Sequence, residues 1–127
     1  MFRIVQGSVL PHFTNPRMGL SAHLEGLTAG MLLVLMGGCV WEYLNLSEKI
    51  KKVAYYLGLY ASYGTWAGTF LAAILGTSRL TPIAGSGYGG SEGQETVVTL
   101  YLVSVSLSIL IDFCFLLYGL RNIDVKK

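Results

Sequence analysis

Residues 96–120, TVVTLYLVSVSLSILIDFCFLLYGL, form an apolar run in which Asp112 is the one charged side chain. At about 1.5 Å per residue, a helix of this length reaches roughly 37 Å, more than the ~30 Å hydrocarbon core of a bilayer. Mostly apolar stretches of similar length occupy residues 16–44 and 53–77, and Asn15 and Pro16 are residue types that begin a helix. The sequence therefore predicts an all-α membrane protein with three full spans in an antiparallel bundle.

The composition of the chain agrees with this fold class. Of its 127 residues, 53% are hydrophobic and 13% are charged, whereas soluble domains average about 25% charged residues. We expect one transmembrane helical domain over residues 1–127, with the lipid bilayer as its surroundings. The net charge of +2 and the absence of any basic run longer than a Lys pair argue against a nucleic-acid partner. Cys39 and Cys114 stand apart in apolar segments, and we interpret them as packing residues.

The N-terminal stretch is too short for a further span. Residues 2–13 include apolar side chains, but a helix of this length reaches only about 18 Å. We interpret the stretch as a partial N-terminal helix or a surface segment. The apolar stretch after Arg3 is also too short for a signal peptide.

Basic residues are distributed unevenly between the two ends of the predicted spans. Lys49, Lys51 and Lys52 follow the first span, and Arg121, Lys126 and Lys127 follow the last, whereas Arg17 and Arg79 fall on the other side. The positive-inside rule places loop 45–52 and the C-terminus in the cytoplasm of a cell with the protein in its inner or plasma membrane. The glycine-rich loop 78–94 then faces outward, and we expect a hydrophilic connector there, with a lid as the alternative.

Polar side chains inside predicted spans mark candidate functional positions, because ionisable groups in hydrocarbon are costly unless they are paired or face a cavity. At ~100° per residue, Arg17, Ser21 and Glu25 share one side of their helix, and His23 lies about 160° from Glu25. These opposed faces, and the presence of only one other histidine, His12, argue against a metal site. An ion pair between Arg17 and Glu25 and an inter-helix hydrogen bond of His23 are the structural alternatives.

Regular side-chain stripes on the helices predict how they pack. Gly19, Gly26 and Gly30 form one small-residue stripe, and Gly64, Gly68 and Ala72 form another, which allows close helix contacts. A chain with so few spans is not expected to cover both stripes, so we predict a homo-oligomer. Two further stripes have open interpretations: an aromatic stripe of Tyr56, Tyr60, Tyr63 and Phe70, and a line of Ser104, Ser108 and Asp112 that we interpret as a hydrogen-bonded seam rather than a cavity wall.

Helices that alternate in direction bring distant residues to the same depth. Residues 15–25, 66–77 and 95–105 then share one half of the bilayer, so Arg17, Glu25, Trp66 and Glu95 are expected to converge on one pocket. Tyr60 and Tyr63 would form its floor nearer the midplane. Such a pocket suits a small aromatic molecule with one polar group.

The segment NPRMGLSAHLEG, residues 15–26, resembles the signature block of the hydroxylaminobenzene mutase family. The resemblance continues through residues 59–63, Trp66, residues 81–85 and 94–95, and residues 102–107, and it covers roughly residues 9–120. The family consists of small membrane proteins with four spans that isomerise an aryl hydroxylamine to an aminophenol in a Bamberger-type rearrangement used in nitroaromatic degradation. The resemblance implies the same activity and no redox cofactor. This sequence departs from the pattern in having only about a dozen residues before Asn15, where a complete first span is expected.

The residue types suit this chemistry, which needs a group that protonates the N–OH oxygen near neutral pH. Glu25, deep in its span, is the first candidate, and Glu95, at a helix N-terminus that favours its charged form, is better suited to capping or to binding the amine. Arg17 and His23 complete the predicted catalytic set. For substrate binding we predict the ring faces of Tyr60, Tyr63 and Trp66, which can stabilise an electron-poor intermediate, together with Asn15 and Ser21. A proton-coupled transporter and a structural membrane subunit are the alternative functions.

Overall fold

The computed structural model describes residues 13–121, and all regular elements in that range are helical. The predicted all-α class is confirmed. The elements in chain order are α2 (Pro16–Leu35), the π-helical turn η2 (Met36–Val40), the 3₁₀ turn η3 (Trp41–Tyr43), α3 (Glu48–Leu75), α4 (Pro82–Gly85) and α5 (Glu92–Leu120). The predicted N-terminal helix over residues 2–13 lies outside the described residues, except for Phe13.

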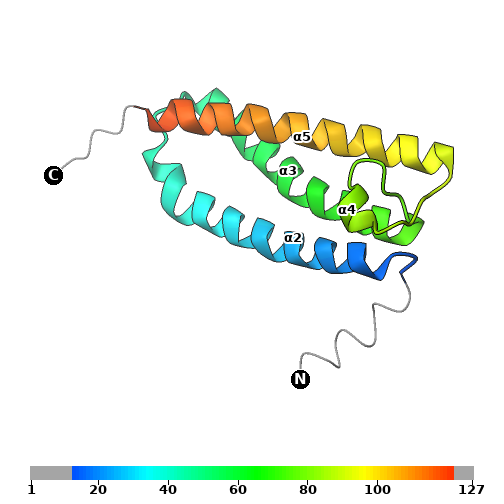
Figure 1. Ribbon diagram of the computed structural model, residues 1–127. Coiled ribbons are helices and arrows are strands. Elements are labelled where there is room, and N and C mark those ends of the chain that lie inside the picture. The colour runs from blue at the N-terminus through cyan, green and yellow to red at the C-terminus, as the bar shows by residue number, and fades with distance from the viewer. Residues whose placement is uncertain (1–12, 122–127) are drawn as a thin grey trace, which may run out of the picture.

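The three long helices run antiparallel, with α3 in the middle (Figure 1). Helix α3 packs along both α2 and α5, whereas α2 and α5 hardly touch each other. The short turn of residues 44–47 and the C-terminal end of α5 lie at one end of the bundle, which we call the turn end. Phe13, α4 and residues 76–91 lie at the other end, which we call the α4 end. The outer helices therefore flank a furrow whose floor is α3.

Capping residues determine where the helices begin and end. Asn15 caps α2, because its side chain accepts a hydrogen bond from the Met18 N–H, and Pro16 occupies the first helical position as predicted. Gly76 ends α3 in the left-handed conformation, with φ of 72°. Ser91 and Gln94 form a capping box at the start of α5. Helices α3 and α5 therefore begin before the predicted spans 53–77 and 96–120, because caps and polar first turns extend each helix beyond its apolar part.

The predicted first span, residues 16–44, is helical as far as Tyr43 but not uniform. Its α-helix ends at Leu35 and continues as the π-helical and 3₁₀ turns. Gly37 and Gly38 lie in the π-helical turn, where the pair weakens the regular helix, and such turns often lie beside functional sites. The irregular stretch brings Trp41 against Tyr55 of α3, with ring centroids 5.9 Å apart.

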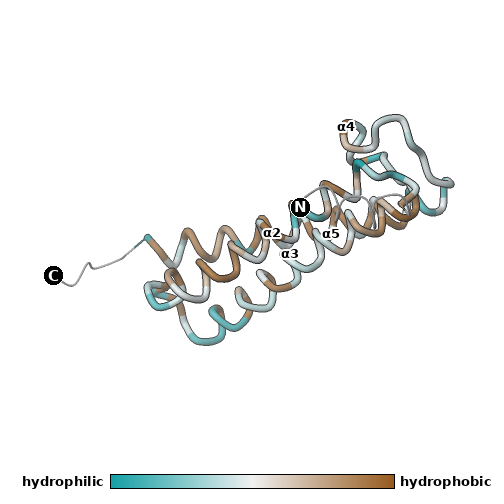
Figure 2. The backbone as a smooth tube through the Cα atoms, turned by 90° about the horizontal axis from the view of Figure 1, so that it is seen from below, coloured by the Kyte–Doolittle hydropathy of each residue, from teal (hydrophilic) through white to brown (hydrophobic). Residues whose placement is uncertain are grey.

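The surface of the long helices is apolar over most of their length. Among residues 13–121, the stretches Pro16–Tyr43 and Glu92–Leu120 are long and apolar enough to cross a membrane. Figure 2 shows hydrophilic colour concentrated at the two ends of the bundle. These features agree with a helical membrane protein. Helix α3 is long enough to cross but carries Lys, Gly, Ser, Thr and Tyr residues that lower its hydropathy, so the third span stays a prediction.

Both predicted small-residue stripes are used in close contacts within the chain, except at Gly30 of α2, where a Cβ would meet nothing within 4 Å. A Cβ at Gly68 would lie 2.5 Å from Leu102 Cδ2, and one at Gly64 would lie 2.8 Å from Val105 Cγ2, so this stripe seats α5 on α3. On α2, a Cβ at Gly26 would lie 2.9 Å from Trp66 Cδ1. Most of both stripes is therefore covered within the chain, because α3 has two different faces and packs against a helix with each. The predicted homo-oligomer stays a prediction.

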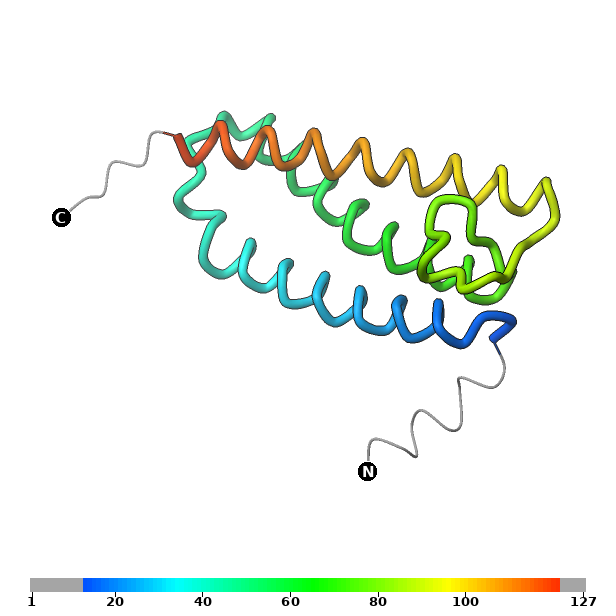
Figure 3. The backbone as a smooth tube through the Cα atoms, viewed as in Figure 1, coloured from blue at the N-terminus to red at the C-terminus, as the bar shows by residue number. Residues whose placement is uncertain are grey.

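The segment between α3 and α5 is tied to the bundle at several points, and it is more structured than the predicted connector. Figure 3 shows it leaving α3, passing toward the start of α2 and returning to α5. The fully buried Asn15 side chain donates to the Gly85 carbonyl at 2.9 Å. The Ser78 hydroxyl donates to the Tyr88 carbonyl at 2.6 Å. Glycine supplies the tight backbone here, since Gly87 has φ of 87°.

Candidate active site

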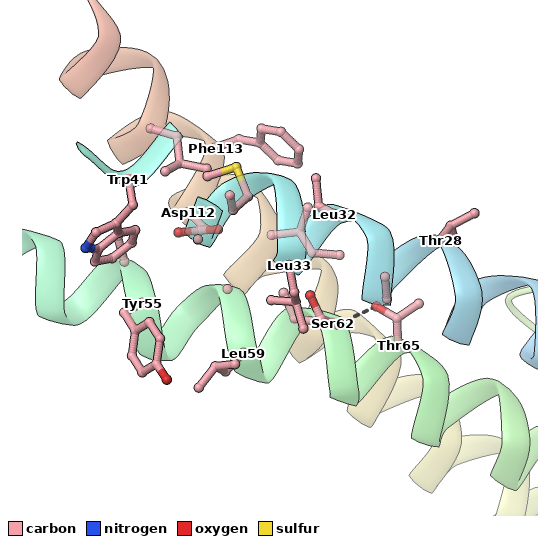
Figure 4. A pocket seen from close by; sticks show the side chains of 18 of the residues that line it. Thr28, Leu32, Leu33, Trp41, Tyr55, Leu59, Ser62, Thr65, Asp112 and Phe113 are labelled. Atoms are coloured by element: carbon pink, nitrogen blue, oxygen red, sulfur yellow. Dashed lines mark hydrogen bonds between the residues drawn. The ribbon is translucent and has the colours of Figure 1, made fainter. Parts of the chain in front are cut away.

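A cavity of about 480 Å³ lies in the furrow between α2 and α5, in the half of the bundle near the turn end. Its walls are mostly apolar, and its volume falls within the range of small-molecule sites. Figure 4 shows Trp41 and Tyr55 at one end of this cavity and Thr28 and Thr65 toward the other. The residues that line it on α2 and the turns after it are Glu25, Thr28, Ala29, Leu32, Leu33, Met36, Gly37 and Trp41. Those on α3 are Ala54, Tyr55, Gly58, Leu59, Ala61, Ser62 and Thr65, and those on α5 are Ile109, Asp112, Phe113 and Leu116.

The cavity forms because small residues face the furrow where the outer helices separate. Ala29 on α2 and Gly58 and Ala61 on α3 lie at this level, and each leaves space that a larger side chain would fill. The seven lining positions in α2 and the π-helical turn repeat at three- and four-residue spacing, which defines one helix face. The furrow is thus encoded by small residues on facing helices.

Glu25 is a carboxyl group on this apolar wall. The Thr69 hydroxyl on α3 donates to Glu25 Oε2 at 2.6 Å. Thr69 Oγ1 also lies 2.9 Å from the Thr65 carbonyl, so its proton can turn there when Glu25 itself carries a proton and donates to Thr69. The contact with Thr69 can therefore serve both protonation states of Glu25.

Asp112 of α5 is a second carboxyl on the cavity wall, and the sequence argument did not include it among the site residues. Its Oδ1 atom is buried without a hydrogen-bond partner among residues 13–121. Ser104, Ser108 and Asp112 were predicted to line up as a hydrogen-bonded seam. Ser104 does bond to α3, since its hydroxyl lies 2.8 Å from the Tyr60 hydroxyl. Ser108 bonds instead to the Val105 carbonyl of its own helix. In the sequence, the sign that Asp112 belongs to a functional site was a charged residue within the most apolar segment.

The structure brings Glu25 to the cavity but not the rest of the predicted catalytic set. His23 lies exposed on the opposite face of α2, as its angle from Glu25 predicted. Arg17 reaches toward the α4 end, where its Nη1 lies 3.5 Å from Ser86 Oγ, and neither described ion pair joins it to Glu25. As predicted, the start of α2, the end of α3 and the start of α5 lie together at one end of the bundle, the α4 end. The expected pocket at the α4 end is not where the large cavity lies.

The predicted aromatic binding residues do not line the cavity. Tyr60 and Tyr63 lie about 140–200° around α3 from Gly58, which is on the cavity side. Tyr63 is 63% exposed. Trp66 packs on Gly26 and stacks on Phe70, with ring centroids 5.5 Å apart. The cavity takes its aromatic walls instead from Trp41, Tyr55 and Phe113.

Asn15, Ser21 and Glu95 have structural contacts in place of the predicted substrate contacts. Asn15 joins the start of α2 to α4, and the Ser21 hydroxyl donates to the Arg17 carbonyl of its own helix. Glu95 is 8% exposed, and its carboxylate accepts hydrogen bonds from the backbone N–H groups of Ser78, Arg79 and Gly90 at 3.0, 3.0 and 3.1 Å. Glu95 thus holds the segment between α3 and α5.

We expect Glu95→Gln to destabilise the fold, since an amide keeps one acceptor oxygen and turns an N–H₂ group toward backbone donors. Hydrogen bonds to charged groups contribute about 1.5–3 kcal/mol each, so the loss should be about 2 kcal/mol in the free energy of unfolding. Thermal unfolding in detergent measures it. Glu92→Gln is the control, because Glu92 is exposed and pairs only with Arg79. Equal melting temperatures for Glu95→Gln and the unaltered protein would contradict this role.

The cavity suits a small aromatic molecule that reacts at a polar group. Its apolar walls can enclose a ring, and Glu25 supplies a group that can donate and accept a proton. The furrow opens between helices whose outer surfaces are apolar, so a ligand dissolved in the membrane has a short route to it.

Comparison with known proteins relates the chain to a family of isomerases. The sequence matches the family profile of styrene oxide isomerase over residues 1–121. It is 38% identical over 125 residues to hydroxylaminobenzene mutase HabB of Ectopseudomonas oleovorans, an alignment that covers 98% of this chain and 76% of that protein. Hydroxylaminobenzene mutase HabA of the same organism is 38% identical over 103 residues, covering 80% of this chain and 76% of its own length. No solved structure matches the chain.

The predicted resemblance is therefore confirmed over nearly the whole sequence. Both the family profile and the two relatives are named for reactions that rearrange a phenyl-bearing compound without adding or removing atoms. The chain belongs to the styrene oxide isomerase family and is a relative of the hydroxylaminobenzene mutases.

Proposed function

We propose that this protein is a membrane isomerase that converts hydroxylaminobenzene or a close aryl hydroxylamine to an aminophenol in the Glu25 cavity. The observation that carries the proposal is the Glu25 carboxyl on the wall of an apolar cavity, in a chain related to hydroxylaminobenzene mutases. Substrate and product have the same atoms, so the group that donates a proton to start the reaction must recover one before it ends.

The proposed reaction begins with proton donation from the Glu25 carboxyl to the hydroxyl oxygen of the substrate. The N–O bond then breaks, its electron pair leaves with water, and the positive charge spreads over nitrogen and ring. Water adds to a ring carbon and gives one proton back to the Glu25 carboxylate. The ring proton at that carbon moves to nitrogen, which restores the aromatic ring and gives the amine. One proton is lent and one is returned, so Glu25 is regenerated.

The residues around Glu25 support this reaction by positioning the carboxyl and enclosing the ring. Thr69 can hold Glu25 in place in both protonation states, so we assign it as a positioning residue. The predicted Tyr60, Tyr63 and Trp66 do not line the cavity, and its aromatic residues lie toward the Asp112 end. The ring of a substrate at Glu25 is instead enclosed near Ala29 and Thr65, one helical turn from Glu25 and Thr69.

The family profile also favours styrene oxide as a second candidate substrate. Opening a strained C–O bond begins with the same proton donation to oxygen, and the phenyl ring occupies similar space. Incubating the purified protein with each compound separately, and separating the products, decides between them.

The proposal is distinguished from transport by the need for a gradient. An isomerase turns over hydroxylaminobenzene in detergent with no gradient, whereas a proton-coupled transporter moves protons across liposome membranes when substrate is added. Aminophenol formation in detergent supports the proposal. Substrate-dependent proton flux without any chemical conversion would refute it.

We further propose that all three long helices span the membrane, with loop 45–52 and the C-terminus in the cytoplasm. The support is the position of the charges: Lys49, Lys51 and Lys52 at the start of α3 and Arg121 at the end of α5 share the turn end, and Arg17 and Arg79 share the α4 end. Helix α3 packs along both neighbours, so it crosses wherever they do.

We also propose a homo-oligomer, formed through the part of the predicted Gly19, Gly26 and Gly30 stripe that no contact within the described residues covers. His23, Leu27, Gly30 and Val34 form an exposed stripe on α2, and a Cβ at Gly30 would meet nothing within 4 Å. Small and polar residues on an outer helix face are typical of contacts between membrane helices. Gly30→Leu is therefore expected to lower the oligomeric mass in native mass spectrometry without changing the melting temperature of the chain by more than a few degrees. A monomeric unaltered protein would reject the oligomer.

A further inference from the structure

We propose that the Asp112 end of the cavity is a binding site for lipophilic ammonium ions, meaning a protonated amine carried on an aromatic or short aliphatic body. This site is separate from the reacting group Glu25 and does not depend on the proposed reaction.

The Asp112 carboxyl has no partner for its charge among the described residues. Its Oδ1 is buried and accepts no hydrogen bond within residues 13–121. Its Oδ2 lies over Gly58 of α3, where a Cβ would be only 3.2 Å away. Glycine at that position leaves the approach to the carboxyl open. An isolated buried carboxylate is costly, so this group gains most from a ligand that brings N–H donors and a positive charge.

The walls around Asp112 provide no cation of their own. None of the described residues that line the cavity is Lys, Arg or His. The nearest aromatic side chains of the lining are Trp41, Tyr55 and Phe113, which attract a cation through their ring faces and cover an apolar body. A protonated amine on a small apolar body therefore meets a carboxylate at its charged end and apolar or aromatic atoms around its body.

The Asp112 site is distant from Glu25 within the same cavity. Gly58 touches Asp112, and Thr69 touches Glu25. These two α3 residues are eleven positions apart, or about 16 Å along the helix. A small amine at Asp112 therefore leaves the Glu25 carboxyl uncovered. Figure 4 shows Asp112 toward the Trp41 end, which is the end nearer the turn of residues 44–47.

The location of Asp112 near the turn end also gives a charged amine access to its carboxyl. From Asp112 to the end of α5 at Leu120 is eight residues, or about 12 Å. Trp41, Tyr43, Tyr55 and Tyr118 lie within this part of the bundle, and aromatic residues of this kind are common at the membrane interface. An amphipathic amine collects at the same interface, with its charge toward water and its body toward lipid.

The test uses isothermal titration calorimetry of the purified full chain in detergent, with 2-phenylethylamine as the probe. This amine is protonated at neutral pH, as the Lys side chain is, and 2-phenylethanol is its neutral counterpart. We expect saturable binding of the amine, binding at least tenfold weaker to Asp112→Asn, and weak binding of the alcohol that Asp112→Asn does not change. Asp112→Asn keeps the shape of the side chain, and its melting temperature shows whether it has folded.

Two further variants make the result specific. Gly58→Ala places a methyl group against Oδ2 and is expected to weaken amine binding while leaving the carboxylate charge intact. Glu42→Gln removes a charge from the exposed η3 turn at the same end and is expected to leave binding unchanged. The proposal is overturned by absence of saturable amine binding to the unaltered protein, by equal affinity of Asp112→Asn, or by loss of binding in Glu42→Gln. Because no turnover is measured, none of these results depends on the isomerase activity.

Discussion

Glu25→Gln is expected to lower the turnover of hydroxylaminobenzene by roughly 10²–10⁴-fold, the range that loss of a general acid produces. The amide keeps the size of the side chain and still accepts the hydrogen bond from Thr69, 2.6 Å away in the unaltered protein. The amide has no acidic proton to donate to the substrate. Folding should therefore change little, and the loss should appear in kcat, measured as aminophenol formed per enzyme at saturating substrate.

Three comparison variants test whether the loss belongs to Glu25. Thr69→Val removes the hydroxyl that positions Glu25 and should reduce kcat by about tenfold, the effect of one hydrogen bond of ~1.4 kcal/mol. Glu95→Gln should lower stability and, once folded, should retain turnover. If Glu25→Gln stays fully active while His23→Ala abolishes turnover, the reacting group lies on the opposite face of α2 and the cavity assignment fails.

Gly68→Leu is expected to prevent stable assembly of the helices. Even the first added carbon would lie 2.5 Å from Leu102 Cδ2 and 3.0 Å from the Tyr101 ring, and three more carbons would follow. Overpacking of a close contact costs about 1–3 kcal/mol for smaller insertions and more here. We expect a large fall in melting temperature, or loss of the protein to aggregation on extraction from the membrane.

Gly93→Leu is the matched control, since a Cβ at Gly93 meets nothing within 4 Å and the position lies in the first turn of α5. It should extract and melt like the unaltered protein. A Gly68→Leu protein that melts at the normal temperature would show that α3 and α5 do not pack as closely as described.

The sequence was sufficient to predict most of the fold. The length of the apolar runs predicted the three long helices, and Asn15 with Pro16 predicted the start of the first. The helix ends were less accurate, because the capping box at Ser91 and the polar first turn of α3 extend the helices outside their apolar parts. The π-helical turn at Met36–Val40 was not predicted, since a pair of glycines in an apolar run has many possible effects.

The candidate site was harder to predict, because depth in a membrane does not determine which way a side chain points. Helical angles correctly separated Glu25 from His23. They did not show which face of α3 would meet α2, and the aromatic stripe with Tyr60 and Tyr63 was assigned to the wrong face for the cavity. Glu95 was at the expected end of the bundle, but only tertiary structure reveals that three backbone N–H groups occupy its carboxylate. Asp112 was visible in the sequence but was interpreted as part of a hydrogen-bonded seam and not as a residue of the cavity.

The most direct test of the central claim is the mass balance of hydroxylaminobenzene incubated with the purified protein in detergent, without a membrane gradient. An isomerase should convert the compound to aminophenol mole for mole over many turnovers, and a protein-free sample should not do so at the same rate. We expect this result for the unaltered chain. Hydroxylaminobenzene that remains unchanged with correctly folded protein, or that is consumed without an equal amount of aminophenol, would contradict the proposed function.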